Sequence, residues 1–328
     1  MNGKILIKID NKIVKLWSKL GPRAIYGQIL FDMAKKNKKL IALSSDLGRS
    51  SGLRTFSKEL PNQFFNVGIA EQNLIGISSG LARQNFCVFS STFAPFASLR
   101  ASEQVRMNMG YMQEPVKLVA LASGFALGFL GNSHFGIEDI AIMRAIPGIT
   151  IISPADCAEL YKCLIAVEHL SKPIYLRLTG GPGMPVVYDK DYDYQIGKAN
   201  IIRPITKINV LSHGITVGHA FNAIKDLEKS GIKIGLVNMH TIKPIDKDVI
   251  VSLLDNSENL LIFEEHTLIG GLGSAILELI NDQKIITKCK IYRYGLKDNF
   301  PKTGNYNYII KNLELDAEGI KASIKKFL

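Results

Sequence analysis

The sequence predicts an α/β fold made of two doubly wound parallel-sheet domains. Short runs of apolar and β-branched residues alternate with segments of helical periodicity, and polar turn residues follow each run. Strands that are apolar at nearly every position are typical of a parallel sheet covered by helices on both faces. The chain has 328 residues, of which 47% are hydrophobic and 21% are charged. This length and balance indicate more than one globular domain.

The alternation divides the chain into an N-terminal extension (1–20), a first domain (21–185), a linker (186–207) and a second, smaller domain (208–328). The linker is expected where Gly, Pro and three tyrosines occur without a clear period. The expected strands are 40–44, 86–89, 116–120, 150–152 and 174–176 in the first domain, and 208–211, 234–237, 260–263 and 290–292 in the second.

The composition argues against several classes of function. The net charge of +11 comes mainly from lysines spread along the chain, whereas nucleic-acid binding favours a clustered basic stripe with aromatic residues between. The four cysteines show no CxxC pair or zinc spacing, so we expect a reducing cytoplasm and no metal ligands in this chain. The N-terminus lacks the apolar core of a secretory signal, and the run 116–131 is too interrupted to cross a bilayer. We expect neither a nucleic-acid nor a membrane partner.

Glu71 is the first candidate functional residue. It lies in Val-Gly-Ile-Ala-Glu-Gln-Asn (67–73), where a Gly-containing turn ends and an apolar-periodic segment begins. We therefore expect it in the first turn of a helix. A carboxylate at that position can also have a purely structural role, because it stabilises the helix through the macrodipole. Phe93 and Phe96 follow an expected strand three residues apart, and aromatic residues at such places are core packing in most proteins.

These motifs, together with Gly-Asn-Ser-His-Phe-Gly-Ile-Glu-Asp (131–139), resemble the pyrimidine-binding domain of thiamine diphosphate enzymes, and closely the C-terminal half of transketolase. The resemblance implies that Glu71 bonds the aminopyrimidine ring of the cofactor and that Phe93 and Phe96 stack on that ring. It also implies that Asp46 lies beside the thiazolium ring. One departure lies nearby, since Leu99 stands where transketolases usually place a tyrosine.

The chemistry explains why a carboxyl group is needed. The thiazolium C2–H is a very weak acid, and the cofactor's own imino group removes its proton only when the far ring nitrogen is protonated or strongly hydrogen-bonded. Glu71 would make that bond, since a carboxyl group enclosed by apolar side chains can be a donor near neutral pH. His134 is the second predicted catalytic residue, because an imidazole there could bond a ketose hydroxyl and move protons. A lone loop histidine is otherwise commonly a surface group.

The resemblance also implies a site for a sugar or sugar phosphate. Arg23 and Ser50 match phosphate contacts of the family, and a planar guanidinium suits phosphate because it can bond two oxygens. Arg177 could replace part of the charge that this chain lacks, although an arginine within a strand is as often a structural pair. The sequence therefore leaves open whether the sugar substrate is phosphorylated. The chain departs from the family at three positions. Gly180 stands where the family has an arginine, Ala122 where it has a histidine, and Leu130 where it has an aspartate.

Three further segments are interpreted as structural. The first, Arg100, Glu103 and Gln104, indicates a solvated or interface face of a helix. The run 270–274 superficially resembles a dinucleotide loop, but its third glycine and a downstream acid are missing. The turn 264–266 resembles one in the C-terminal domain of the family, and we interpret its histidine as a packing or interface residue.

The chain contains no Gly-Asp-Gly sequence, the motif with which the superfamily holds the Mg²⁺ and diphosphate of thiamine diphosphate. Mg²⁺ needs near-octahedral oxygen ligation, so such a motif cannot be improvised. The resemblance therefore implies a separate N-terminal transketolase subunit that carries the Mg²⁺ ligands. We expect this chain to be the C-terminal subunit of a split transketolase, inactive alone, which self-associates into a dimer core and joins two partner subunits in a heterotetramer.

Alternative functions stay open. The β subunit of a 2-oxo-acid dehydrogenase shares the fold, the glutamate and the two-chain arrangement, but it decarboxylates its substrate. The amino-acid sequences of segments 46–50 and 133–140 favour transketolase. Deoxyxylulose-phosphate synthase is also similar, but it is normally one continuous chain. A non-catalytic assembly module would retain the fold without activity. The joint presence of Glu71, Phe93, Phe96 and His134 argues against that module.

Overall fold

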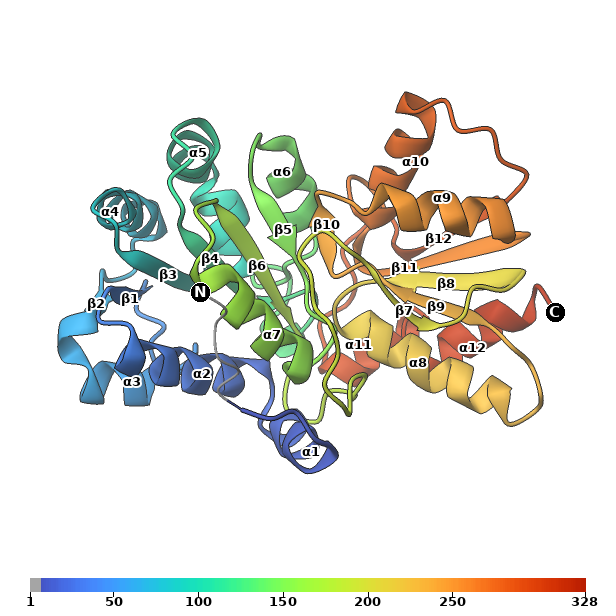
Figure 1. The fold of residues 1–328 in the computed structure, drawn as a ribbon, viewed down its shortest axis with the longest axis horizontal. Coiled ribbons are helices and arrows are strands. Elements are labelled where there is room, and N and C mark those ends of the chain that lie inside the picture. The colour runs from blue at the N-terminus through green and yellow to red at the C-terminus, as the bar shows by residue number, and fades with distance from the viewer. Residues whose placement is uncertain (1–6) are drawn as a thin grey trace.

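Two parallel-dominant sheets form the framework of the computed structural model, which describes residues 7–328 (Figure 1). Residues 1–6 of the expected extension 1–20 lie outside the described residues. The rest of the extension contains helix α1 (Asn11–Leu20), capped by the Asp10 side chain, which accepts a bond from the Ile13 amide. The α/β class with helix-covered sheets is confirmed.

The first sheet has the strand order β10-β5-β6-β4-β3-β1-β2. All of its pairings are parallel except that of β10 with β5. The prediction missed two of its strands, β2 and β10. The strands are β1 (Leu40–Ser44), β2 (Phe64–Asn66), β3 (Cys87–Phe93), β4 (Lys117–Ser123), β5 (Thr150–Ile152), β6 (Ile174–Thr179) and β10 (Thr241–Lys243).

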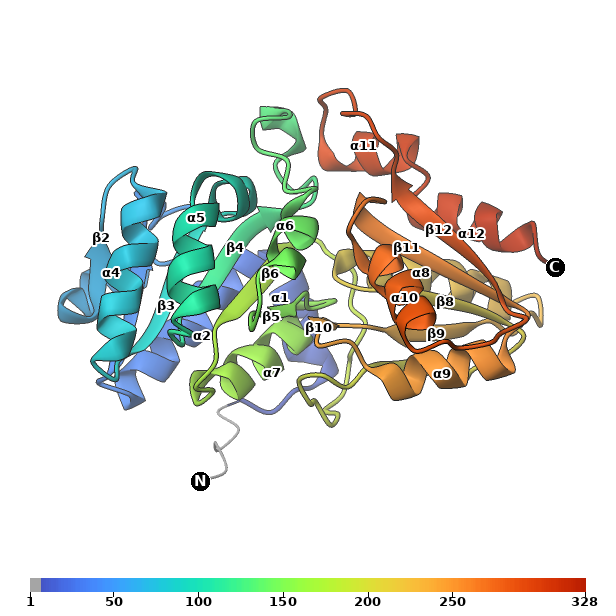
Figure 2. The ribbon, with the colours of Figure 1, turned by 90° about the horizontal axis from the view of Figure 1, so that it is seen from above.

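Helices cover both faces of the first sheet (Figure 2). One face packs against α1, α2, α3 and α7 through a cluster that includes Trp17, Tyr26 and Tyr161. The other face packs against α4, α6 and the π-helical turns η2 and η3 through a cluster that includes Leu74 and Met109. The bounds are α2 (Pro22–Lys36), α3 (Arg54–Glu59), η1 (Pro61–Gln63), α4 (Glu71–Arg83), η2 (Phe96–Arg100), α5 (Ser102–Gln104), η3 (Val105–Tyr111), η4 (Gly128–Leu130), α6 (Asp139–Ala145) and α7 (Cys157–Glu168).

The second sheet has the order β12-β11-β8-β9-β7, with β7 antiparallel to β9 at one edge. Strand β7 lies inside the segment expected to be a linker, 186–207, so the end of that segment belongs to the second sheet. Helices α8, α11 and α12 pack on one face, and α9 and α10 pack on the other. The bounds are β7 (Asn200–Arg203), β8 (Ile208–Ser212), α8 (Ile215–Glu228), β9 (Gly235–Asn238), α9 (Lys247–Asn256), β11 (Asn259–Thr267), α10 (Leu272–Asp282), β12 (Lys290–Leu296), α11 (Tyr306–Asn312) and α12 (Ala317–Lys325).

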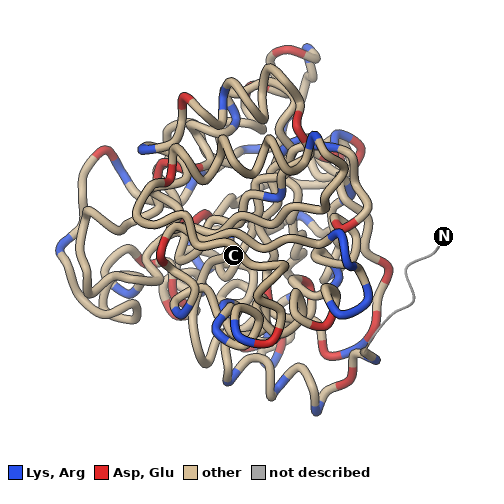
Figure 3. The backbone as a smooth tube through the Cα atoms, turned by 90° about the vertical axis from the view of Figure 1, so that its left-hand side faces the viewer, with Lys and Arg blue, Asp and Glu red and all other residues tan. Residues whose placement is uncertain are grey.

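The charged residues are dispersed over the fold. Lys and Arg positions are interspersed with Asp and Glu positions around the backbone in Figure 3. Within residues 7–328, every helix is too short or too polar to traverse the hydrocarbon layer of a bilayer.

Two helix-interior glycines give a matched test of this packing. A Cβ on Gly27 of α2 would lie 2.0 Å from the carbonyl oxygen of Gly52, whereas a Cβ on Gly76 of α4 would meet nothing within 4 Å. We expect Gly27→Ala to lower the free energy of unfolding by about 1–3 kcal/mol through overpacking against backbone. Gly76→Ala should raise it by roughly 0.5–1 kcal/mol, since Ala is the better helix former. Urea denaturation measures both; equal effects would contradict the close approach of α2 to Gly52.

Candidate active site

The carboxyl ends of four neighbouring strands meet at one edge of the first sheet, in the order β4-β3-β1-β2. Asp46 follows β1, Glu71 follows β2, and Phe93 ends β3, while the loop that carries His134 follows β4. This edge is the usual ligand site of an open parallel sheet. The topology therefore brings together segments that are far apart in the sequence.

Glu71 is the first residue of α4, as expected, and its side chain is only 3% exposed. Amide groups at the start of a helix and the helix macrodipole favour an acid at this position. One carboxylate oxygen accepts a hydrogen bond from Arg100 at 3.0 Å. The hydrogen bonds among residues 7–328 give the other oxygen no partner. A guanidinium thus replaces part of the apolar wall that the sequence predicted around Glu71.

Arg100 is the site residue that sequence reasoning missed. Its guanidinium pairs with Glu71 and also lies 4.0 Å from the centroid of the Phe96 ring, a cation–π geometry. The available signal was the four-residue spacing of Phe96 and Arg100, because side chains four apart share a helix face. The interpretation of Arg100 as part of a solvated or interface helix face is only half right, since the side chain is 48% exposed but contacts two of the predicted cofactor residues, Glu71 and Phe96.

Phe93, Phe96 and His134 form a triangle of rings. The ring centroids of Phe93 and Phe96 are 6.0 Å apart, and the His134 ring lies 5.9 Å from the first and 5.4 Å from the second. Both histidine contacts are edge-on, which aromatic quadrupoles favour. The structure therefore places these three predicted residues together and joins them to Glu71 through Arg100.

Asp46 is held at the end of β1 by a residue of the neighbouring strand. The Asn66 side chain accepts a bond from the Asp46 amide and donates one to the Asp46 carboxylate, both at 3.0 Å. Asp46 has a φ of 55°, a left-handed conformation that Asp tolerates better than most residues. Asn66 therefore fixes the direction of the Asp46 carboxylate, which is exposed.

Arg23 and Ser50 lie together beside the start of α2. The Arg23 guanidinium donates a bond to the Ser50 carbonyl oxygen at 3.3 Å, and burial lowers the pKa of Arg23. Both residues line a cavity of about 340 Å³ that also includes Arg49 and Pro182. Two arginines at one cavity provide the kind of surface that binds phosphate or another anion.

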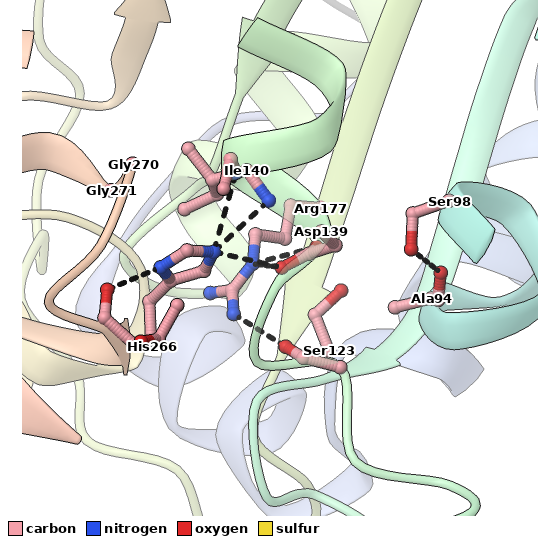
Figure 4. A network of polar contacts seen from close by, with 12 residues as sticks. Ala94, Ser98, Ser123, Asp139, Ile140, Arg177, His266, Gly270 and Gly271 are labelled. Carbon is pink, nitrogen blue, oxygen red and sulfur yellow. Dashed lines mark hydrogen bonds and ion pairs between the residues drawn. The ribbon is translucent and has the colours of Figure 1, made fainter. Parts of the chain in front are cut away.

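Arg177 lies away from that cavity and is fully buried within β6. Its guanidinium pairs with Asp139 at 2.9 Å and donates bonds to the carbonyl oxygens of Gly136 and Glu265, each at 2.9 Å. Figure 4 shows Arg177 and His266 converging on Asp139. These contacts agree with the alternative interpretation of Arg177, in which it forms a structural ion pair and does not bind substrate.

The Gly-rich segment 270–274 is closed to an external anion. The amides of Leu272 and Gly273, at the start of α10, donate to the carboxylate of Glu264 at 2.7 and 3.1 Å. The chain therefore supplies its own anion at this helix N-terminus. His266 accepts a bond from the Ile140 amide, and burial lowers its pKa to about 4, in agreement with a packing role. In the described part of the chain, no group of three or more His, Cys, Asp or Glu residues could hold a metal ion.

Comparison with known proteins identifies the family. Residues 18–181 match the transketolase pyrimidine binding domain, and residues 197–320 match the transketolase C-terminal domain. The chain is 36% identical over 306 residues to a putative transketolase C-terminal section from Methanocaldococcus jannaschii, covering 93% of this chain and 95% of that one. It is 33% identical to one of the subunits of apulose-4-phosphate transketolase from Phocaeicola vulgatus, covering 93% of this chain and 97% of that relative.

A solved structure described as a split gene transketolase, inactive beta4 tetramer, superposes with a TM-score of 0.82 at 33% identity and covers 94% of this chain and 97% of that chain. The chain belongs to the transketolase family.

The buried ion pair yields a stability prediction. Arg177→Met leaves the Asp139 carboxylate buried without its cation, so we expect the free energy of unfolding to fall by about 3–5 kcal/mol. The control is Lys207→Met in the exposed Lys207–Glu258 pair, whose side chains are 80% and 64% exposed; there the loss should stay below about 1 kcal/mol. Chemical denaturation measures both losses, and equally small losses would contradict the prediction that the buried pair contributes more to stability than the exposed one.

Proposed function

We propose that this chain is the C-terminal subunit of a two-chain, thiamine diphosphate-dependent transketolase, which transfers a two-carbon ketol unit from a ketose or ketose phosphate to an aldose. The observation that supports the proposal best is the arrangement of four residues at the carboxyl edge of the first sheet: Glu71, Phe93, Phe96 and His134. Membership of the transketolase family supports it independently.

The residues at this edge fit an aminopyrimidine ring. Glu71 keeps one carboxylate oxygen without a partner among the described residues, and Phe93 and Phe96 offer an aromatic surface beside it. Arg100 covers one face of Phe96, so stacking on that face requires its guanidinium to swing aside. When bound, the cofactor would supply the nucleophilic carbon for breaking and forming the C–C bond. Glu71 would hold the hydrogen bond to the ring nitrogen that makes the imino group basic.

The neighbouring residues would bind the sugar. The Nδ1 atom of His134 lies 3.0 Å from the Ser133 hydroxyl, which leaves Nε2 for a ketose hydroxyl and for proton transfer. Arg23 and Ser50, with Arg49 beside them, would hold a phosphate or other anionic end of the substrate. We assign Arg177 to the domain junction and not to the substrate.

The chain would complete its site only with a partner. The sequence lacks Gly-Asp-Gly, so we place the Mg²⁺ and diphosphate ligands on a separate N-terminal subunit. The similar protein described as an inactive beta4 tetramer supports a chain that self-associates and is inactive without its partner. We propose a heterotetramer with two copies of each subunit.

Reconstitution tests this proposal. The chain is mixed with an N-terminal transketolase subunit from the same organism, thiamine diphosphate, Mg²⁺, a panel of ketoses and aldoses, and a 2-oxo acid. We expect ketol transfer from the mixture and none from either chain alone, measured by product analysis. Turnover by this chain alone would contradict the two-chain model. Decarboxylation of a 2-oxo acid without ketol transfer would favour the dehydrogenase alternative or the synthase.

Glu71→Gln tests the proposed catalytic carboxyl group. Loss of this group should lower kcat of the assembled enzyme by about 10²–10⁴-fold, the usual contribution of acid–base catalysis, while the melting temperature stays near that of the wild type. The matched control is Glu103→Gln, since Glu103 lies on the adjacent α5 and its side chain is 69% exposed. Full turnover by the Glu71→Gln enzyme would remove the basis of the proposed mechanism.

A further inference from the structure

The loop that carries His134 is closed at its base by two backbone bonds. The amide of Gly124 donates to the carbonyl oxygen of Gly136 at 2.7 Å, and the amide of Gly136 donates to that of Gly124 at 3.0 Å. We call residues 124–136 the His134 loop. Its position in chain order, after β4 and before α6, assigns it to the first domain.

The base of the His134 loop nevertheless lies in the hydrophobic core of the second domain. Phe125 and Phe135 stack edge to face with ring centroids 5.1 Å apart, and both are fully buried. They belong to the cluster formed by β8, β11, α8, α11 and α12, which includes Phe263 and Ile309. Figure 2 shows the loop standing beside α11. The second domain therefore determines where the two ends of the loop lie.

Glu265 of β11 makes the polar part of this attachment. One of its carboxylate oxygens accepts a bond from the Phe125 amide at 2.6 Å, and the other accepts one from the Tyr306 hydroxyl at 3.2 Å. Arg177 joins the other end of the loop to the same strand, since it donates to the carbonyl oxygens of Gly136 and Glu265.

The approach of Glu265 to the loop is close enough to require glycine. A Cβ on Gly124 would fall 2.3 Å from a Glu265 carboxylate oxygen, and the φ of Gly124 is +67°. A side chain at this position would therefore meet both a clash and an unfavourable backbone conformation. The Phe125 amide is buried beside Glu265, and a buried N–H that loses its acceptor is destabilising.

We propose that Glu265 is a positioning residue that holds the His134 loop for ketol transfer, so that the C-terminal domain contributes to the active site through this loop. The catalytic part of this inference rests on the function proposed above for His134. The attachment of the loop to Glu265 can be measured without any reaction.

Hydrogen–deuterium exchange of the full chain, followed by mass spectrometry, tests the attachment. In Glu265→Ala we expect peptides within 125–135 to exchange about tenfold faster, because the buried Phe125 amide is left without its acceptor and such a loss favours local opening. Glu265→Gln keeps an acceptor for the Phe125 amide and should stay near the wild-type rate.

The matched control is Glu264→Ala. Glu264 is the preceding residue of β11, is also fully buried, and also accepts backbone amides, but those amides start α10. This variant should speed exchange around 270–275 and leave 125–135 unchanged. The same pattern in both variants, or faster exchange throughout the chain for Glu265→Ala alone, would overturn the specific attachment. If Glu265→Ala does not fold, Tyr306→Phe removes only the hydroxyl donor and should speed the same loop peptides to a smaller degree; no change there would also overturn it.

Kinetics of the assembled enzyme test the positioning role. A misplaced His134 should lower kcat/KM for the ketose by about 10- to 100-fold in Glu265→Ala, mainly through KM, with unchanged affinity for thiamine diphosphate and recovery in Glu265→Gln. Normal kinetics with a loosened loop would overturn the positioning role. A wild-type pair that performs no ketol transfer would refute the proposed function and the catalytic part of this inference, whereas the exchange result still decides the attachment.

Discussion

The buried ion pair of Arg177 and Asp139 is the interaction on which the geometry of both domains depends. Two charges removed from water are stable together only when further hydrogen bonds satisfy them. Here Tyr175 donates to Asp139, and Arg177 donates to carbonyl oxygens on the His134 loop and on β11. The Nη1 atom of Arg177 is buried without a partner among the described residues, and the remaining bonds of this cation connect a strand of the first sheet, the base of the His134 loop and a strand of the second sheet.

Sequence patterns predicted the interior strands because these strands are buried on both faces. Strand β1 was predicted with its observed bounds, and the other long strands were located within a few residues. The missed strands β2, β7 and β10 are three or four residues long and lie at sheet edges. Their backbones pair on one side only, so their sequences need no continuous apolar run. β10 also pairs with the sheet of the other domain, a long-range contact that no local pattern records.

The candidate site was predictable where local sequence determines position. A turn followed by helical periodicity placed Glu71 at the start of α4, and the end of β3 placed Phe93 and Phe96. Arg177 and Arg100 show what local sequence does not contain. Whether an arginine faces a ligand or a buried partner depends on which residues other strands and helices bring to it, and for Arg177 these come from α6 and β11. Glu264 is a similar case, since only the fold shows that it fills the start of α10.

The contact between Arg100 and Glu71 also bears on how the buried Glu71 carboxylate is stabilised. Glu71 is buried, and a carboxylate in that position without a partner would be destabilising. Arg100 pairs with it while remaining 48% exposed, whereas Glu71 is 3% exposed, so water screens this ion pair from the Arg100 side only. Stacking of a flat heterocycle on aromatic side chains is worth about 0.5–1.5 kcal/mol beyond the area that it buries. In the proposed enzyme, the area buried by the ring would add to this stacking, and Arg100 would stabilise Glu71 before the cofactor binds.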